Sequence, residues 1–394
     1  MEFIVIGLDD NKEPDFNKHI RSLISSHSVF SGGKRHHELV KKLLPPDYTW
    51  IDITVPLDNV FRQYALWGEI VVFASGDPLF FGFATTIQKR LPQAKIILYP
   101  CFNSLQTLSH RLLLPYHDMH TVSLTGRPWH EFDKTLIEGG KKIGILTDRE
   151  KTPPAIAQRM LEFGYDNYQM TVGELLGNTE ERIRRFSLPE VCKQEFQFPN
   201  CIILEQTYPR ERPFGLPEED FHLLNRRSKM ITKMPVRLLS LSMLDLRSRQ
   251  HLWDIGFCTG SVSIEAKLQF PHLHITAFEQ RPEGEELMYA NCQKFGTPGI
   301  EIIAEDFTTA DLTGIPYPDA VFIGGHGGKM KEILHILSEK IVSGGPVVFN
   351  SVSEESNRLF TVTAEQCGFT ITKRHRITVD QHNPIEIIQA TKNS

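Results

Sequence analysis

The sequence lacks the patterns in which cysteine and histidine usually hold metals. Its six cysteines form no C-x-x-C pair, and its sixteen histidines include no H-E-x-x-H. Neither a structural zinc site nor a disulfide framework is therefore predicted. We expect reduced thiols, as in a cytoplasmic protein, and no bound metal. A run of about 18 uncharged apolar residues is also missing, so no membrane-spanning helix is expected.

An excess of positive charge is missing as well. Lysine and arginine number 43 against 48 aspartates and glutamates, which gives a formal net charge of -5. Affinity for nucleic acids comes mostly from the neutralisation of phosphates, so this balance disfavours a nucleic-acid partner. Any basic surface must be local. The first seven residues lack the basic segment of a signal peptide and are typical of a strand.

What the sequence does have is two successive series of short apolar runs that alternate with longer amphipathic stretches. This alternation is typical of α/β folds with mostly parallel strands. Three prolines among charged residues, Pro209, Pro213 and Pro217, interrupt it and indicate a linker. The length of 394 residues also suits at least two domains. We predict a first domain at 1–205, a linker at 206–225 and a second domain at 226–394.

The strongest local motif is WDIGFCTGS, residues 253–261, which runs from a predicted strand into a predicted helix. Gly256 and Gly260 allow a tight turn, and the helix N-terminus offers free N–H groups to an anion. The pattern is not the G-x-G-x-x-G of dinucleotide enzymes, and Asp254 precedes the first glycine. An acid can bind an ammonium group, and a helix N-terminus beside it can bind a carboxylate. The methionine end of S-adenosylmethionine carries both of these groups.

Acids also stand at the ends of the next two predicted strands. Glu279 at the second strand can accept hydrogen bonds from both ribose hydroxyls. Asp306 at the third can take the adenine amine, with the backbone N–H of Phe307 near the ring. Each acid alone is also typical of a solvated loop. Three of them at successive strand ends indicate a cofactor site.

The fourth predicted strand ends in GGHGG, residues 324–328. Four glycines in five positions predict a backbone surface that a large ligand approaches closely, and we assign Gly325 to the substrate. A flexible loop is the alternative explanation. His326 in its centre is a candidate acid, base or carboxylate donor, although a loop histidine without a chemical role fits as well.

These strings resemble the corrin carbon 15 methyltransferases of cobalamin biosynthesis, which also decarboxylate an acetate side chain. The similarity covers 226–394 and includes the segments 230–233, 236–237, 253–256, 259–266, 318–325 and 383–385. It implies a Rossmann-like class I S-adenosylmethionine-dependent methyltransferase fold. Together, the similarity and the motif at 253–261 predict ten cofactor contacts. They are Thr232, Asp254, Gly256, Phe257, Cys258, Thr259, Gly260, Glu279, Asp306 and Phe307. Cys258 departs from the family, where glycine is usual, and so does Phe307-Thr308, where Ala-Pro is usual.

In the first half, the string FASGDPLFFG, residues 73–82, resembles the tetrapyrrole methylase family, and within it the carbon 5 methyltransferases of the same pathway. A bare Gly-Asp-Pro is equally well explained as a structural turn. The similarity covers 1–205, with further matching segments at 31–36, 123–127, 146–150, 152–153 and 172–177, and it implies a two-lobed α/β domain. Implied cofactor contacts are Gly76, Asp77, Phe80, Asn103 and Ser104, and Arg127 is assigned to the substrate. The chain departs from the family at Gly7-Leu8-Asp9-Asp10, where a glycine-rich loop is usual, and at 100–104.

Between 226 and 249 the charge becomes strongly basic, with one acid, Asp245, among seven cations. The cations are Arg226, Arg227, Lys229, Lys233, Arg237, Arg247 and Arg249. A corrin precursor carries several carboxylates, and a guanidinium can bind two carboxylate oxygens at once. We predict that Lys233 and Arg237 bind the substrate. A solvated surface beside the linker is the alternative.

Together these features predict a bifunctional S-adenosylmethionine-dependent methyltransferase that resembles the family of decarboxylating precorrin-6Y methyltransferases. The first half is expected to methylate carbon 5 of a precorrin or cobalt-precorrin, and the second to methylate carbon 15 and release carbon dioxide, with His326 returning a proton. Alignment of the reactants is the main catalytic demand. We also expect a homo-oligomer with neither nucleic-acid nor membrane partners.

Two alternatives to this function stay open. The first half could be a substrate-binding scaffold without activity of its own, which its altered first loop suggests. A nucleic-acid methyltransferase would share the cofactor fold. Amino-directed enzymes of that class usually carry an Asn/Asp-Pro-Pro-aromatic loop after the fourth strand, where this chain has GGHGG.

Overall fold

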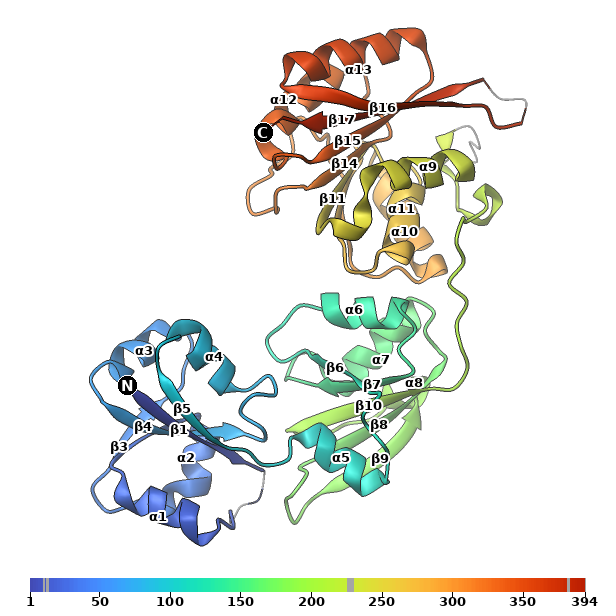
Figure 1. The fold of residues 1–394 in the computed structure, drawn as a ribbon. Helices are drawn as coiled ribbons and strands as arrows, with labels where there is room; N and C mark the ends of the chain where they lie inside the picture. Colours follow the sequence, from blue (N-terminus) through green and yellow to red (C-terminus); the bar gives the residue numbers. More distant parts are fainter. Residues whose placement is uncertain (10, 12–13, 225–229, 381–382, 394) are drawn as a thin grey trace. The chain divides into compact units, whose positions relative to one another are not determined.

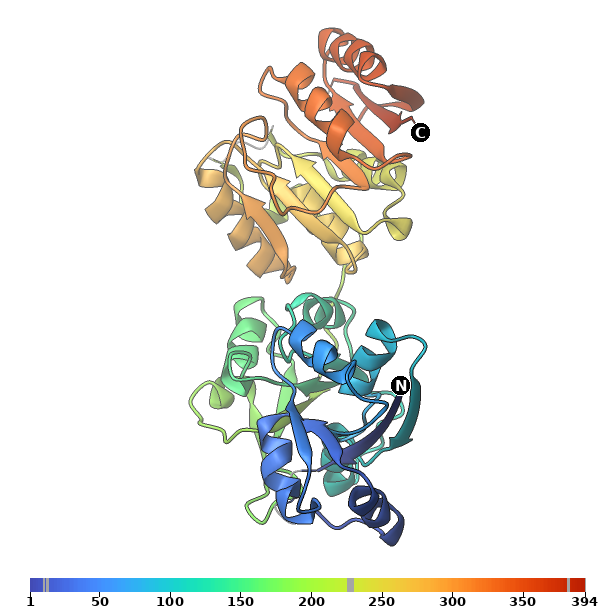
Figure 2. The same ribbon diagram turned by 90° about the vertical axis from the view of Figure 1, so that its left-hand side faces the viewer.

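The computed structural model describes residues 1–9, 11, 14–224, 230–380 and 383–393. The chain forms two compact units, coloured along the sequence in Figures 1 and 2. The first unit comprises Met1–Arg127, Lys141–Gln158 and Tyr168–Thr207, and the second Pro128–Gly140, Arg159–Asn167 and Tyr208–Ser394. Both are α/β, as predicted.

The first sheet of the first unit is parallel throughout, in the order β3-β2-β4-β1-β5. Its strands are β1 (Glu2–Leu8), β2 (Val29–Gly32), β3 (Thr49–Asp52), β4 (Glu69–Ser75) and β5 (Lys95–Tyr99). Its helices are α1 (Lys18–Ser26), α2 (Lys34–Val40), α3 (Asp58–Tyr64) and α4 (Phe83–Arg90). Buried side chains of α3 and α4 pack on one face, and those of α1 and α2 on the other. Because both faces are covered, strands such as IVVFA in β4 are apolar at every position.

The second sheet, in the order β6-β7-β10-β8-β9, is mainly antiparallel. Its strands are β6 (His120–Ser123), β7 (Lys142–Leu146), β8 (Tyr168–Glu174), β9 (Arg182–Ser187) and β10 (Asn200–Gln206). The helices that precede or separate these strands in sequence are α5 (Ser104–Leu112), α6 (His130–Ile137), α7 (Pro153–Glu162) and α8 (Leu188–Val191). Of these, α6 belongs to the second unit, and α7 is divided between the two units. Only β6 and β7 pair in parallel. The expectation of mostly parallel strands is therefore wrong for this sheet, because β8 turns directly into β9 without a crossover helix.

The second unit contains a seven-stranded sheet in the order β13-β12-β11-β14-β15-β17-β16. Its strands are β11 (His251–Ile255), β12 (His274–Phe278), β13 (Ile300–Ile303), β14 (Ala320–Ile323), β15 (Pro346–Ser351), β16 (Phe369–Ile377) and β17 (Ile385–Lys392). Its helices are α9 (Met234–Leu244), α10 (Ser261–Gln269), α11 (Glu283–Phe295), α12 (Met330–Lys340) and α13 (Glu354–Gln366). The pairing is parallel from β13 to β15, whereas β17 runs antiparallel to both of its neighbours.

Helices cover both faces of this sheet (Figures 1 and 2). Apolar side chains of α12 and α13 pack on one face, and those of α9 and α10 on the other. The strand order reverses between β11 and β14, and a parallel sheet binds its ligands at the carboxyl ends of the strands at such a point. Among the described residues, no helix is long and apolar enough to cross a bilayer.

Arg237 on α9 forms a fully buried ion pair with Glu265 on α10. Both side chains are 0% exposed, and Arg237 Nε lies 3.3 Å from Glu265 Oε2. The guanidinium also donates to the carbonyls of Thr232 and Leu216. The Glu265 carboxylate in turn accepts the N–H groups of Gly215 and Leu216, each at 2.9 Å. The prediction that Arg237 binds the substrate is therefore corrected: this cation ties the chain before α9 to the core.

The other cations of the basic stretch that the structure describes do not line the cavity described below. Arg226, Arg227 and Lys229 lie outside the described residues. Arg247 is exposed and Arg249 half-buried, and neither lines that cavity. Lys233 immediately precedes α9, half-buried, and its predicted role stays a prediction.

We expect Arg237→Ala to lower the free energy of unfolding of the second unit by about 3–5 kcal/mol, because the charge of Glu265 would stay buried without its partner. Urea unfolding followed by tryptophan fluorescence measures the change. Arg358→Ala, which removes an exposed arginine on α13, is the control and should change the stability by about 0.5 kcal/mol or less. Equal effects of the two substitutions would contradict the structural role of Arg237.

Candidate active sites

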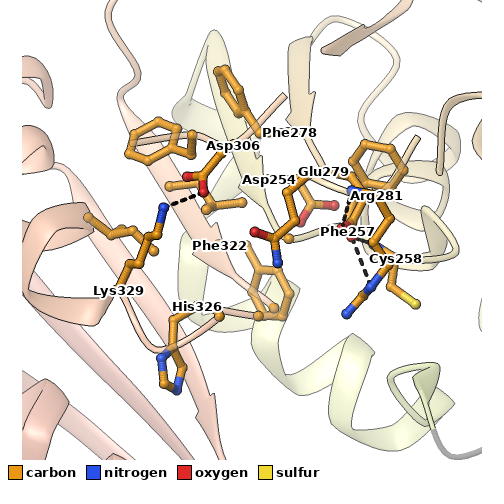
Figure 3. A pocket seen from close by; sticks show the side chains of 18 of the residues that line it. Asp254, Phe257, Cys258, Phe278, Glu279, Arg281, Asp306, Phe322, His326 and Lys329 are labelled. Carbon is orange, nitrogen blue, oxygen red and sulfur yellow. Dashed lines mark hydrogen bonds and ion pairs between the residues drawn. The ribbon is translucent and has the colours of Figure 1, made fainter. Parts of the chain in front are cut away.

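A cavity of about 280 Å³ opens in the second unit at the carboxyl ends of β11, β12 and β14 (Figure 3). It lies at the reversal of strand order, where the fold favours a ligand. Its lining includes most of the predicted cofactor contacts and both of the predicted residues in the glycine-rich loop. These are Thr232, Asp254, Gly256, Phe257, Cys258, Glu279, Asp306, Phe307, Gly325 and His326.

Asp254, in β11, is a buried carboxylate with one unsatisfied oxygen. Its side chain is 0% exposed. Oδ2 accepts a hydrogen bond of 2.6 Å from Ser263 Oγ on α10, whereas Oδ1 has no partner among the described residues. Burial raises the pKa of this carboxyl from 3.8 to about 7. Since a buried charge needs a partner, the free oxygen suits the ammonium group predicted for it.

The turns that follow β11 and β14 pass so closely that Gly256 has no room for a side chain. Its φ is +72°, and a Cβ atom there would lie 2.4 Å from the carbonyl oxygen of Gly325. Cys258 also adopts a left-handed conformation, with a φ of 55°, although it has a side chain. The departure from glycine at 258 therefore leaves the turn intact, at the cost of strain.

Glu279 directly follows β12 and binds the turn that follows β11. Its side chain is 3% exposed. Oε2 accepts the N–H of Cys258 at 3.0 Å and lies 3.3 Å from Arg281 Nη1, while Oε1 accepts the N–H of Arg281 at 3.2 Å. A carboxylate has about four acceptor positions, and three are occupied here, so one remains for a ribose hydroxyl. Figure 3 shows Glu279 between the Phe257–Cys258 turn and Asp254.

Asp306 is paired with Lys329, a residue that the sequence analysis missed. Asp306 Oδ2 accepts a hydrogen bond of 2.6 Å from Lys329 Nζ, and Oδ1 accepts from the N–H and the hydroxyl of Thr308 at 2.9 and 2.8 Å. Lys329 and Thr308 hold the pKa of Asp306 below its usual range. A lysine directly after the glycine-rich loop was the available signal, because that loop and the one after β13 meet at the same sheet edge.

Two residues that the family resemblance assigned to the cofactor do not line the cavity. Thr259 is 1% exposed, and its hydroxyl has no partner among the described residues. A Cβ atom at Gly260 would lie 1.7 Å from the sulfur of Met288 on α11, so its lack of a side chain serves helix packing. Phe307 does line the cavity and packs its ring edge-on against Trp253 and Phe278.

His326 stands at the cavity as a neutral hydrogen-bond donor. Its Nδ1 accepts the N–H of Gly328 at 3.2 Å, so a neutral ring carries its proton on Nε2. Partial burial lowers the pKa of this imidazole, which favours the neutral ring at pH 7. The ring also meets Phe349 edge-on, with 5.9 Å between centroids.

A larger cavity, of about 840 Å³, lies in the first unit. The predicted residues Gly76, Phe80, Asn103, Ser104 and Arg127 line it. Asp77 is absent from this lining; its Oδ1 accepts the N–H of Leu79 at 2.9 Å, which fits the structural turn left open above. Asn103 caps α5 by accepting the N–H of Gln106. Its side chain therefore has a structural use besides any contact with a ligand.

The two cavities have opposite charge. Among the described residues, the first-unit cavity is lined by four cations, Lys34, Arg35, Arg127 and Arg149, and by the single acid Asp9. The second-unit cavity is lined by four acids and two cations. They are Asp254, Glu279, Glu305, Asp306, Arg281 and Lys329. The first cavity therefore favours an anionic ligand and the second a cationic one.

Comparison with known proteins finds relatives of the whole chain and of each part. Residues 224–393 match the model of the precorrin methyltransferase domain, and residues 16–192 that of the tetrapyrrole (corrin/porphyrin) methylases. A precorrin-6Y C(5,15)-methyltransferase [decarboxylating] of Sinorhizobium sp is 32% identical over 97% of this chain and 91% of its own length. A cobalt-precorrin-6B C(15)-methyltransferase (decarboxylating) of Salmonella typhimurium is 40% identical over 32% of this chain and 64% of its own. A crystal structure of precorrin-6y C5,15-methyltransferase from Geobacter metallireducens is 31% identical, covers 46% of this chain and 98% of that one, and has a TM-score of 0.42.

The raised pKa of Asp254 should make the protein less stable as pH rises. This carboxyl titrates near pH 7 in the folded chain and near 3.8 when unfolded, so between these values the folded state binds more protons. We expect Asp254 to lower the free energy of unfolding by up to about 1.4 kcal/mol for each pH unit in that window. Urea unfolding of ligand-free protein at several pH values measures the slope. Asp254→Asn should flatten it; identical slopes for the two proteins would contradict the assignment.

Proposed function

The chain belongs to the family of precorrin-6Y C(5,15)-methyltransferases (decarboxylating), and we propose that it carries out its two methyl transfers in its two separate cavities. It is thus a methyltransferase and decarboxylase of cobalamin biosynthesis. In the proposed division, the first unit methylates carbon 5 of a precorrin or cobalt-precorrin. The second unit methylates carbon 15 and decarboxylates an acetate side chain. The observation that supports this most is the pair of cavities, each lined by the residues of one unit.

S-adenosylmethionine is the cofactor that we assign to the second-unit cavity. When bound, it supplies an activated methyl group on a sulfonium cation. The free Oδ1 of Asp254 suits its ammonium group, and the buried carboxylate of Glu279 suits a ribose hydroxyl. Lys329 holds Asp306 by an ion pair, which leaves Asp306 with less capacity for the adenine amine than we expected. The acidic lining as a whole also attracts a cation.

The chain's own residues have two further tasks at this site. The backbone at Gly325 lets a large ring approach, because no side chain stands there. Loss of carbon dioxide leaves an electron pair on the acetate carbon and in the conjugated ring, and a proton must then be returned. His326 presents Nε2–H at the cavity, and we assign it to this step. The neutral ring would first take up a proton from solvent, and the resulting imidazolium would return that proton to the carbon and become neutral again.

The first unit is an enzyme rather than a scaffold in this proposal. A Cβ atom at Gly7 would lie 2.1 Å from the carbonyl oxygen of Gly76, so the altered loop after β1 still ends its strand against the Gly76 turn. Arg127 and Arg149 lie over the rings of Phe81 and Phe198, at 4.8 and 4.9 Å from their centroids. Such cation and ring pairs suit a flat macrocycle that carries carboxylates.

Incubation of the full chain with precorrin-6Y and S-adenosylmethionine should give a product with two added methyl groups and one lost carboxyl group. Mass spectrometry measures the net change in mass, and ¹³C-methyl labelling with NMR locates each methyl group on the ring. The same reaction with the cobalt-containing macrocycle decides which form is preferred. A product with a single methyl group would remove one unit from the proposal.

Two substitutions should separate the reactions. Asp254→Ala removes the proposed ammonium partner and should lower methylation at carbon 15 at least about tenfold, with carbon 5 unaffected. Gly76→Val should do the reverse, since a Cβ there would lie 2.9 Å from Asn103 Cα in a backbone with a φ of +59°. Labelled-methyl NMR of the product measures both positions, so each variant serves as the control for the other. Loss of both methyl groups in either variant would contradict two independent sites.

A further inference from the structure

A hydrogen-bonded group in the first-unit cavity has no role in the function proposed so far. It consists of Arg35 and His36, at the start of α2, and Ser75, the last residue of β4. All three line the cavity of about 840 Å³. Arg35 and His36 belong to the SGGKRH segment that resembles the tetrapyrrole methylases, but that resemblance assigned no task to them.

The hydrogen bonds decide which nitrogen of His36 carries the proton. The N–H of Gly33 donates to Nδ1 at 3.3 Å, so Nδ1 is an acceptor. Burial and the neighbouring Arg35 lower the pKa of His36 to about 4, so the ring is neutral at pH 7. A neutral imidazole with an accepting Nδ1 has its hydrogen on Nε2. His36 therefore presents a donor at Nε2 rather than a base.

This donor determines the direction of the Ser75 hydroxyl. His36 Nε2 lies 2.9 Å from Ser75 Oγ, and Arg35 Nη2 donates to the same oxygen at 3.1 Å. These two bonds occupy both lone pairs of the hydroxyl oxygen. The hydroxyl hydrogen must then point elsewhere, and no hydrogen bond in which Ser75 Oγ is the donor is found among the described residues. Ser75 is exposed at the cavity, so its hydrogen is available to a ligand.

From this geometry we propose that Arg35, His36 and Ser75 form a carboxylate-binding group in the first-unit cavity. Ser75 donates its hydroxyl hydrogen to a carboxylate oxygen, Arg35 supplies positive charge, and His36 is the positioning residue that orients the hydroxyl. The inference rests on the proposed function for its ligands, which are a carboxylate side chain of the macrocycle or the methionyl carboxylate of the cofactor.

The charge of the cavity supports an anionic ligand at this group. Lys34, Arg127 and Arg149 line the same cavity with Arg35, against Asp9 as its one acid among the described residues. Hydrogen bonds to a charged group are also stronger than those between neutral groups. A donor that two other donors hold in place loses little freedom when the ligand binds, which raises the affinity it contributes.

The neighbouring His37 has a structural role outside the cavity. Its ring stacks on Trp50 with 4.1 Å between centroids, and its Nε2 lies 2.8 Å from the hydroxyl of Tyr48. It does not line the cavity. His37 is therefore a matched control for His36: the same residue type, one position away, without the contact to Ser75.

The first test is Ser75→Ala in the full chain. We expect the dissociation constant of one carboxylate ligand to rise about tenfold, with kcat changed less than KM. Calorimetry with S-adenosylhomocysteine measures the cofactor arm, and absorbance titration with precorrin-6Y measures the macrocycle arm. A change in the macrocycle arm alone assigns the group to the substrate, and a change in the cofactor arm alone assigns it to the methionyl end. No change in either arm would overturn the proposal.

The second test distinguishes a positioning donor from a base. In His36→Gln, the side-chain amide can still donate to Ser75, so binding and carbon 5 methylation should stay within about threefold of wild type. His36→Leu should weaken binding as Ser75→Ala does. His37→Leu is the control and should leave the affinity of the folded protein unchanged. Loss of turnover in His36→Gln with binding intact would show that His36 is a base and refute the assigned role.

Failure of this inference is distinguishable from failure of the proposed function. If wild-type protein binds precorrin-6Y or S-adenosylhomocysteine and Ser75→Ala weakens that binding, the carboxylate group stands even without methylation at carbon 5. If wild-type protein methylates carbon 5 and Ser75→Ala matches it in both binding arms, the function stands and the carboxylate group is refuted.

Discussion

Burial of the Asp254 carboxylate is the constraint on which the second-unit site depends. The group stands in the central strand of the parallel sheet, out of contact with water, and the protein supplies a hydrogen bond to only one of its oxygens. An ionised carboxylate in such a place is costly unless a partner neutralises it. Below about pH 7 a proton meets this need in the free protein, and a bound ammonium group can replace that proton. Ligand binding and the stability of the fold are therefore coupled through one side chain.

The arrangement around Asp254 follows from the same sheet edge. Parallel strands end together, so the turns after β11, β12 and β14 and the loop after β13 meet within a small volume. Position 256 requires glycine because the backbone of Gly325 lies too close for a side chain. Glu279 accepts the N–H of Cys258 in the turn after β11, and Lys329 joins the loop after β14 to Asp306. These contacts connect the four loops to one another at the cavity.

Much of this could be predicted from the sequence, because the strands and glycine turns are local signals. Asp254, Gly256 and Glu279 lie at the ends of clear apolar runs, and the structure brings them to one cavity. Arg237 was misjudged because nothing in a linear sequence shows that Glu265 and two carbonyls will surround it. The link between Lys329 and Asp306 was missed for the same reason, since it joins two different loops. Gly260 lies in the predicted turn, but it does not line the cavity, and the packing of Met288 explains why it has no side chain.

Each cavity takes its lining from one unit only, and this has a consequence for the order of events in time. In the proposed division of the reactions, a macrocycle that has been methylated in one cavity must be released before it can bind in the other. The intermediate therefore passes through the solvent between the two methyl transfers. Because one polypeptide carries both cavities, every translated chain supplies them in a one-to-one ratio, and neither site can be produced in excess of the other.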